Sequence, residues 1–324
     1  MENMENTNKY FSPNQKMAQL EGAKHRRALL ANVKEAAKRA IDSGLLDEAE
    51  KMDTILSGPT GIGKTYNMTK ALNDVGLKEN EDFILLKGDH SMTAFAIKLM
   101  MAHRAFTLGK KHGTETLIVM VDDCDSFFKD KASRNILKGL LGSKGSRQLQ
   151  YNKMLPEHML TDRQHAVLEH YRHTDGSPGF TIPCDDVAFV FTTNFVFPTE
   201  RQSRQESEKG LTAKSLVYAD LVAIRGRVKL KPFHMNMATN WGWIAEVALN
   251  DGLLDILDDV EGLPDVDYAK YLLLDFIANK WENMTESNLR TVTDMALTMK
   301  KHGMSARDIW TVDFLKQSQS VISL

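Results

Sequence analysis

The chain has 324 residues, of which 42% are hydrophobic and 26% are charged. These fractions lie near the averages of globular proteins and exclude a collagen-like, low-complexity or wholly disordered chain; at this length we expect roughly two domains. The 41 basic and 43 acidic side chains nearly cancel, so a nucleic-acid surface would have to be a local patch.

The cysteine pattern and the N-terminal sequence indicate the compartment. Cys124 and Cys184 form no CxxC pair, which excludes a disulfide framework or a zinc knuckle and favours a reducing environment. The N-terminus lacks the basic start and apolar run of a signal peptide, and no stretch of about 18 apolar residues occurs. We therefore expect a cytoplasmic protein with no membrane partner.

Residues 1–50 are expected to form a polar tail followed by a basic amphipathic helix. Ser12 and Pro13 have the pattern of a helix start, and apolar residues then recur at spacings near three and four up to Ile41. The other face of this helix is basic, which is more typical of a solvated face than of a binding surface.

Residues 51–231 show short apolar runs separated by helical stretches, the pattern of a parallel α/β sheet that is buried on both faces. The expected strands are Thr54–Leu56, Phe83–Leu86, Leu117–Val121, Val187–Thr192 and Val228–Leu230. The expected helices are Lys64–Asn73, Thr93–Thr107, Ser133–Leu141 and Leu211–Ile224. The long connection between the third and fourth strands predicts an insertion at residues 142–180.

Residues 232–324 lack the strand pattern and predict a small all-helical domain. The expected helices are Trp241–Asn250, Gly252–Leu257, Tyr268–Trp281, Asn288–His302 and Ser305–Ser318. The first part of this segment is acidic, with no Lys or Arg between Pro232 and Ala269.

The segment from Gly58 to Thr65 fits the pattern G-x-x-x-x-G-K-T, which is typical of a phosphate-binding P-loop. An expected strand precedes it and an expected helix follows, so its backbone N–H groups and the positive helix end would converge on phosphates. Lys64 would contact the β- and γ-phosphates of ATP, and the Thr65 hydroxyl would bind Mg²⁺. The nucleotide-binding residues expected here are Gly58, Pro59, Thr60, Gly61, Ile62, Gly63, Lys64, Thr65 and Tyr66.

Polar residues also follow two other expected strands. Asp122 and Asp123 end the third strand, where Asp122 can support Mg²⁺ and Asp123 can face an attacking water, although acidic strand ends also occur as helix caps. Asp125 is a third candidate for this role, but we interpret it as a cap for the helix that follows. Asn194 ends the fourth strand and could position water or touch the γ-phosphate, or it could be an ordinary turn residue.

The order of these motifs, with the pair Arg225 and Arg227 and a helical C-terminal segment, resembles the AAA+ ATPases over about residues 50–305. The resemblance implies a five-stranded parallel αβα P-loop core with a C-terminal helical lid, usually assembled into homo-oligomeric, often hexameric, rings with ATP between subunits. It matches Asp122 and Asp123 to Walker B, Asn194 to sensor 1 and Arg290 to sensor 2. It also indicates Arg227, in preference to Arg225, as an arginine finger, whereas the alternative is that either arginine simply caps a helix.

Two departures from the family pattern bear on activity. The family usually has Glu where this chain has Asp123, which is one methylene shorter, so hydrolysis could be slow. Protein-threading members usually carry an aromatic residue next to an apolar residue and Gly after the second strand. Residues 87–92 have no aromatic, which argues against a polypeptide unfoldase.

A small-molecule kinase is a further possibility, although it would not need the Asn strand, the Arg pair and a distal lid arginine together.

The insertion is the main indication of a substrate. It combines aromatic Tyr151 and Tyr171 with basic residues, which suits a nucleic-acid backbone and base stacking, but an ordinary mixed-charge surface fits equally well. Residues 138–173 contain the basic residues Lys138, Lys144, Arg147, Lys153, Arg163 and Arg172, the acidic residues Glu157, Asp162 and Glu169, and the histidines His158, His165, His170 and His173. Similarity of residues 122–126, 136–138, 147 and 151 to compact phage or mobile-element AAA+ proteins favours DNA replication or recombination, in the host cytoplasm if the chain is phage-encoded. The alternatives are a protein-remodelling chaperone and an ATP-gated scaffold with little turnover.

Overall fold

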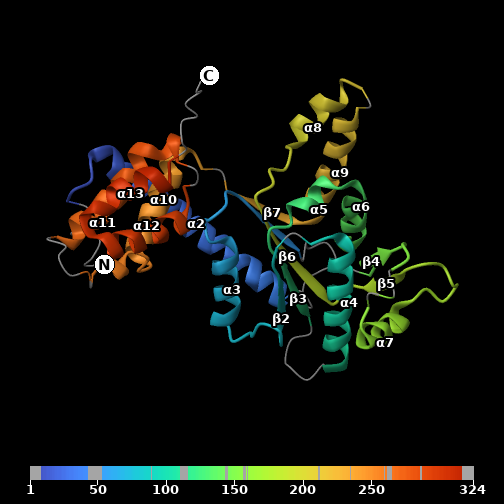
Figure 1. Cartoon of the computed structure of the whole chain (residues 1–324). Coiled ribbons are helices and arrows are strands. Elements are labelled where there is room, and N and C mark those ends of the chain that lie inside the picture. The colour runs from blue at the N-terminus through green and yellow to red at the C-terminus, as the bar shows by residue number, and fades with distance from the viewer. Residues whose placement is uncertain are drawn as a thin grey trace, which may run out of the picture. The chain divides into compact units, whose positions relative to one another are not determined.

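The structure is a computed structural model of the whole chain (Figure 1). It describes residues 9–42, 53–88, 90–109, 116–142, 145–155, 158, 160–210, 212–233, 235–258, 260, 265–284 and 287–315. Contacts between Cα atoms divide the chain into two units. Unit 1 comprises Met1–Leu30, Pro59–Gly63 and His234–Leu324, and unit 2 comprises Ala31–Gly58 and Lys64–Phe233.

Unit 2 is built on a five-stranded parallel sheet with the strand order β2-β3-β6-β1-β7. The strands are β1 (Thr54–Ser57), β2 (Phe83–Leu86), β3 (Leu117–Val121), β6 (Val187–Thr193) and β7 (Lys229–Pro232). Every residue of β1, β3 and β6 is buried, as expected for central parallel strands that are covered on both faces. The five strands expected from the sequence are confirmed to within two residues at each end.

Helices lie on both sides of this sheet (Figure 1). They are α3 (Lys64–Asp74), α4 (Met92–Gly109), α5 (Asp125–Lys129), α6 (Lys131–Leu140), α8 (Glu200–Ser207) and α9 (Ala213–Arg227). Figure 1 shows α3 on one side of the sheet and α4 and α6 on the other, where Phe95, Leu99 and Leu137 join the inward-facing residues of β3 and β6 in one apolar core. The four helices expected here are present; Leu211, the expected start of the last one, lies outside the described residues. The sequence analysis missed α5 and α8.

The segment between α6 and β6 contains secondary structure that the sequence analysis did not resolve. Strands β4 (Gln148–Tyr151) and β5 (Phe180–Pro183) form a separate antiparallel pair, and α7 (Asp162–Tyr171) lies between them in the chain. Thr161 caps α7 in a capping box with Gln164. This segment therefore folds as an extension of unit 2 with its own two-stranded sheet.

Unit 1 is helical in its described residues. It contains α10 (Met237–Asn250), α11 (Val266–Lys280), α12 (Leu289–His302) and α13 (Ala306–Asp313), with short 3-10 turns at η3 (Asp255–Leu257), η4 (Trp281–Asn283) and η5 (Gly303–Ser305). Indole N–H groups tie these helices together, because Trp241 donates to the Leu274 carbonyl and Trp310 to the Met295 carbonyl. The helix expected over residues 252–257 is only the turn η3, and residues 316–318 of the last expected helix lie outside the described residues.

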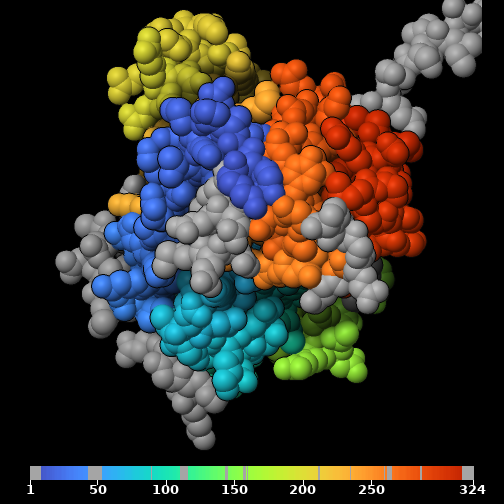
Figure 2. All heavy atoms as spheres, turned by 90° about the vertical axis from the view of Figure 1, so that its left-hand side faces the viewer, coloured from blue at the N-terminus to red at the C-terminus, as the bar shows by residue number. Residues whose placement is uncertain are grey.

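The N-terminal helix α2 (Pro13–Ile41) begins in unit 1 and ends in unit 2. Within unit 1 it packs closely on α10, where Gly22 meets Gly242. Figure 2 shows the N-terminal segment, in blue, next to orange segments of the same unit. A Cβ atom on Gly22 would lie 2.1 Å from the carbonyl carbon of Gly242, so glycine is required at this crossing. Among the described residues, no helix is both long enough and apolar enough to span a membrane.

Candidate functional site

Three neighbouring strands of unit 2 end at the same edge of the sheet. In the strand order, β3, β6 and β1 are adjacent and parallel, so the residues that follow Val121, Thr193 and Ser57 lie together. The backbone joins two of these ends directly, because Gly58 N donates to the Thr193 carbonyl at 3.1 Å. The carboxyl ends of parallel strands are the usual place for ligands in open α/β sheets.

The glycine-rich loop leads from Gly58, after β1, to Lys64 at the start of α3. Gly61 and Gly63 have left-handed backbone conformations, each with φ of 77°, which side chains with a Cβ rarely adopt. Thr60 lies in the same turn, Ile62 is buried, and the Tyr66 side chain is 68% exposed on the first turn of α3. The loop therefore has the conformation that its glycines predict.

Lys64 is a buried cation at this edge, with only 7% of the residue exposed. Its ammonium group donates to the Gly58 carbonyl at 2.9 Å and to Oδ1 of Asn194 at 3.1 Å. Burial lowers the pKa of Lys64 to about 8, and the charges of Asp122 and Asp123 only partly oppose this. A group of negative charge beside Lys64 would restore the ordinary preference for the protonated form.

Asp122 follows β3 and accepts hydrogen bonds at Oδ1 from the hydroxyls of Thr65 and Thr192. The two hydroxyl oxygens lie 3.3 Å apart. One carboxylate thus brings together the start of α3 and the end of β6. Asp122 and Thr65 were expected to share a function, and the structure places them in contact.

Asp123 has a left-handed backbone, with φ of 55°, and an exposed side chain. Positive φ is uncommon outside glycine, and such strained residues are found disproportionately at functional sites. Partial desolvation raises the pKa of Asp123, and the neighbouring charge of Asp122 raises it further, while Lys64 and a hydrogen bond with Asn194 act in the opposite direction. These influences shift the carboxylate toward the range of a general base.

Asn194 is placed between Lys64 and Asp125. Its side-chain oxygen accepts from Lys64, and its backbone N–H donates to Oδ1 of Asp125 at 3.0 Å. The same carboxylate oxygen of Asp125 accepts from the Thr193 hydroxyl. The interpretation of Asp125 as a helix cap is wrong: Cys124 occupies the N-cap position of α5, without a side-chain capping bond, and the Asp125 side chain is bound to the end of β6 instead.

Arg225 and Arg227 lie at the last turn of α9, immediately before β7. Arg227 is exposed and donates to the Ala223 carbonyl of its own helix at 2.7 Å, whereas half-buried Arg225 donates to the Pro198 carbonyl at 3.2 Å. Because β7 pairs in parallel with β1 from Lys229 opposite Thr54, both arginines stand at the amino ends of the strands, away from Lys64. The structure does not bring Arg227 together with the other expected site residues of its own chain.

Arg290 is exposed on the first turn of α12 in unit 1, two residues after the helix cap Asn288. Residues 59–63 belong to the same unit, and a Cβ on Gly61 would lie 2.6 Å from the Cβ of Asn288. The start of α12 therefore contacts the glycine-rich loop within unit 1.

The aromatic surface expected in the insertion is absent, because Tyr151 is only 4% exposed and Tyr171 only 6%. Tyr151 bonds the Thr93 hydroxyl and Tyr171 bonds Nδ1 of His103, so both rings tie the insertion to α4. Arg147 is also buried, with its guanidinium bound to Asp53. These three residues cannot serve as a nucleic-acid surface; Lys144, a fourth residue of the expected patch, lies outside the described residues.

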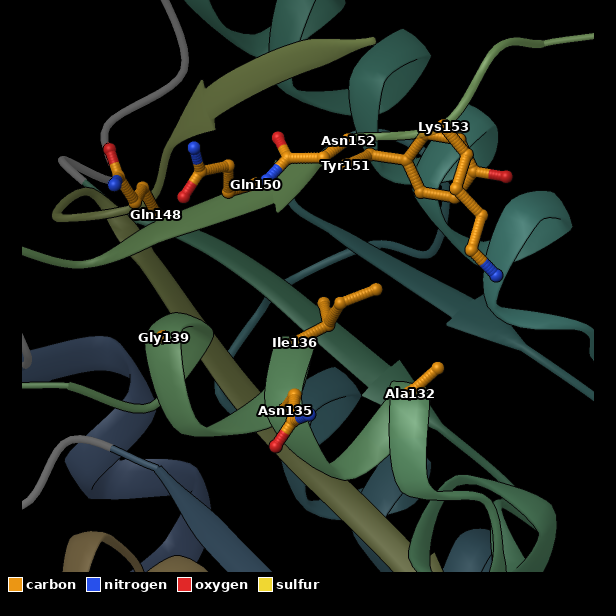
Figure 3. Close-up of a pocket in the computed structure, with 9 residues that line it drawn as sticks. All are labelled: Ala132, Asn135, Ile136, Gly139, Gln148, Gln150, Tyr151, Asn152 and Lys153. Atoms are coloured by element: carbon orange, nitrogen blue, oxygen red, sulfur yellow. The ribbon is translucent and has the colours of Figure 1, made fainter. Parts of the chain in front are cut away.

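A groove of about 400 Å³ remains on the insertion, between α6 and β4 (Figure 3). Its polar lining is rich in amides, and Figure 3 shows Ile136 from α6 on the opposite wall from the strand. Lys153 is the one charged residue among its lining residues, which are Ala132, Asn135, Ile136, Gly139, Gln148, Gln150, Tyr151, Asn152 and Lys153. The groove therefore combines a largely apolar surface with amide side chains, and none of these lining residues is acidic.

The sequence analysis missed one site residue and set another aside. Thr192, which bonds Asp122, was assigned only to a strand, and Asp125, which holds the end of β6, was a third candidate carboxylate but was interpreted as a helix cap. The signal that could have indicated Thr192 is its position at the end of an apolar strand, where a polar side chain costs free energy unless it has a partner.

Within the described ranges, no group of three or more His, Cys, Asp or Glu side chains is arranged to hold a metal ion. A scan against models of protein families gives no match for this chain, and a search of curated proteins gives none either.

Proposed function

We propose that this chain is an ATPase of the AAA+ type, with a P-loop at residues 58–65 and a helical lid in unit 1. The observation that carries the proposal is the buried Lys64 ammonium at the meeting point of three strand ends, with a pKa lowered to about 8. Burying an ammonium group costs free energy. A buried ammonium at the start of a helix, next to the backbone N–H groups of a glycine-rich loop, is suited to binding a polyphosphate.

The donor set also fits Mg²⁺. This ion is usually bound in proteins by one or two carboxylates or hydroxyls together with substrate phosphates, so a closed protein cage is not needed. The Thr65 hydroxyl and the Asp122 carboxylate, which are bonded to each other here, would hold it. The bound ion would neutralise charge that develops on the phosphate oxygens.

Asp123 and Asn194 are suited to acting on the attacking water. Asp123 is exposed at the strand end, and its raised pKa makes its carboxylate a stronger proton acceptor than an ordinary aspartate. The Asn194 amide, next to Lys64, would orient the water or the γ-phosphate. Lys64 would stabilise the negative charge of the transferred phosphoryl group through its ammonium.

The position of Arg227 favours sites shared between copies of the chain. Arg227 stands at the amino ends of the strands, opposite the edge that holds Lys64, and its side chain is exposed. It could therefore reach a γ-phosphate only in another copy, where it would act as an arginine finger in a homo-oligomeric, hexameric ring. Arg290, on the first turn of α12, would be the sensor 2 residue that contacts the nucleotide.

The proposed substrate is DNA or a protein–DNA assembly, of the replication or recombination type. A nucleic-acid surface on the insertion is less strongly supported than the sequence suggested, because Arg147, Tyr151 and Tyr171 are buried. Lys153, beside the groove, and Arg163 and Arg172 are exposed basic residues of the expected patch. Protein remodelling and an ATP-gated scaffold are the competing functions.

Steady-state ATP hydrolysis, measured across protein concentration with and without single- and double-stranded DNA, tests the proposal. Turnover should rise with concentration if sites are shared, and rise again with DNA. Arg227→Ala should bind ATP but lose turnover, and mixing it with Asp123→Asn subunits should restore part of the activity, since each variant lacks a different half of the site. Asn tolerates the left-handed backbone of residue 123, so that variant should keep its fold.

Each other outcome points to a different function. Turnover that is indifferent to DNA favours protein remodelling, and ATP binding without turnover favours the scaffold. Normal turnover by Arg227→Ala would show that this residue is not the finger.

A further inference from the structure

The Asp125 carboxylate is bound to the end of β6 and takes no part in capping its own helix. Its Oδ1 accepts from the Asn194 backbone N–H at 3.0 Å and from the Thr193 hydroxyl. We propose that Asp125 is a positioning residue for Asn194. The inference rests on the proposed ATPase function, because it assigns Asp125 a role in placing the Asn194 amide for hydrolysis.

The turn after β6 is fixed from two sides. On the β1 side, the Ser57 hydroxyl donates to the Phe195 carbonyl at 2.6 Å, and Gly58 N donates to the Thr193 carbonyl. On the β3 side, the Asp125 carboxylate holds Thr193 and Asn194, and the Thr193 hydroxyl in turn accepts from Phe195 N at 3.0 Å. Asp125 thus holds the turn with a carboxylate, whereas the β1 side holds it with a hydroxyl and a backbone N–H.

The Asp125 carboxylate determines where the Asn194 side chain points. The Asn194 amide oxygen is 3.1 Å from the Lys64 ammonium, so a small rotation of the turn would separate the two groups. Bonds to an ionised acceptor are stronger than bonds between neutral groups. A misplacement of about 1 Å in a group that orients a reactant can reduce a rate by about 100-fold.

The neighbouring Asp130 provides a matched control. Its carboxylate also accepts from one backbone N–H and one hydroxyl, those of Ser133 at 2.7 and 2.8 Å, but it caps α6 and does not contact the strand ends. Substitution of either aspartate therefore removes one bond from a backbone N–H and one from a hydroxyl. Of the two, Asp125 is the one bonded to Asn194.

The test compares kcat and ATP affinity in wild type, Asp125→Ala, Asp125→Asn and Asp130→Ala. Asp125→Ala should lower kcat by about 10- to 100-fold, with ATP affinity changed by less than about 3-fold, because Lys64 and Thr65 are untouched. Asp125→Asn should recover most of the rate, since its amide oxygen accepts both hydrogen bonds. Asp130→Ala should lower the Tm and leave kcat within about 2-fold.

A double-mutant cycle separates positioning from general destabilisation. Because Asp125 acts through Asn194, Asp125→Ala should have little further effect on kcat in an Asn194→Ala background. If Asp125→Ala does not fold, Thr193→Val, which has a side chain of the same shape, removes the Thr193 bond to Asp125 together with the bond from Phe195 N and leaves the bond from Asn194 N to Asp125. This variant should give a smaller loss of kcat with unchanged ATP affinity.

Several results would overturn the inference alone while wild type turns over ATP: full kcat in Asp125→Ala or in Thr193→Val, equal loss in Asp125→Asn and Asp125→Ala, or additive effects in the cycle. A wild-type chain that binds no ATP would overturn the proposed function, and this inference with it.

Discussion

The two ends of the central sheet each bury a basic side chain, but they treat its charge differently. At the amino ends, Arg147 donates to both carboxylate oxygens of Asp53, at 2.7 and 2.8 Å, and Asp53 also accepts from Phe189 N. At the carboxyl ends, the Lys64 ammonium bonds a carbonyl and an amide oxygen, and its pKa is lowered to about 8. A bidentate carboxylate neutralises the first cation. Burial disfavours the charge of the second despite the nearby aspartates, and we propose that an anionic ligand would stabilise it.

This difference indicates that the charge of Arg147 stabilises the fold, whereas the charge of Lys64 is suited to binding a ligand. The Arg147 pair joins the insertion, at the start of β4, to the residue before β1, and its Nε also donates to the Leu140 carbonyl. A buried pair of this kind is costly to break because the remaining charge is left without a partner. Lys64, in contrast, should be dispensable for folding.

The largest change in the free energy of unfolding is expected when the buried cation at the amino ends is replaced. Arg147→Met should lower the free energy of unfolding by about 3–5 kcal/mol, because it leaves the Asp53 carboxylate buried without a cation. Urea denaturation measures this, with Arg163→Met as the control: Arg163 is exposed on α7, and its loss should change stability by less than about 0.5 kcal/mol. Equal stabilities of the two variants would show that the Arg147 pair does not hold the insertion.

At the carboxyl ends, replacing the buried cation should have a smaller effect on the free energy of unfolding, and of opposite sign. The pKa of Lys64 is about 8 in the folded chain, below its ordinary value of 10.5, so between these pH values the unfolded chain holds the proton that the folded chain has released. Wild type should therefore gain up to about 3 kcal/mol of stability relative to Lys64→Met as the pH rises from 8 to 10.5. Below pH 8 the cost of the buried charge is fully present, and Lys64→Met should be at least as stable as wild type.

Urea denaturation at pH 7, 8, 9 and 10 measures this difference. Lys70→Met is the matched control, because Lys70 is exposed on the same helix. A wild type that exceeds Lys64→Met in stability at pH 7 would contradict the view that Lys64 is retained for a ligand.

Which of these features the sequence predicts depends on how local their signals are. The five strands and the glycine-rich loop follow from short runs: four or five apolar residues predict a buried parallel strand, and Gly61 and Gly63 predict a turn with positive φ. Lys64, Asp122 and Asn194 meet because each follows a strand of one parallel sheet, which the strand pattern already implies.

The features that were missed depend on pairing over long distances. The burial of Arg147 follows from its contact with Asp53, which lies 94 residues away, and the burial of Tyr171 follows from its contact with His103. Nothing next to Arg147 or Tyr171 in the chain distinguishes a buried from an exposed side chain. Asp125 was misassigned for the same reason, because a carboxylate at the start of a helix usually caps it, and its actual partners lie 68 and 69 residues away.

The smallest change in the free energy of unfolding is expected for Asp130, which lies at neither of these two sites. Bonds from Ser133 lower the pKa of Asp130, so its ionised form stabilises the folded chain above the ordinary pKa of about 4, and this contribution is lost as the pH falls through the lowered pKa. Asp130→Ala should cost about 1 kcal/mol at pH 7 and much less near pH 3. A difference from wild type that does not shrink in thermal unfolding at low pH would contradict the capping role of the carboxylate.

Equilibrium binding of ATP with Mg²⁺ to the wild-type chain, Lys64→Ala and Lys70→Ala tests the central claim most directly. The account predicts that wild type and Lys70→Ala bind with similar affinity, and that Lys64→Ala loses binding while it keeps its fold, because the loop then lacks its cation. Unchanged affinity in a folded Lys64→Ala variant, or no binding by wild type, would contradict it.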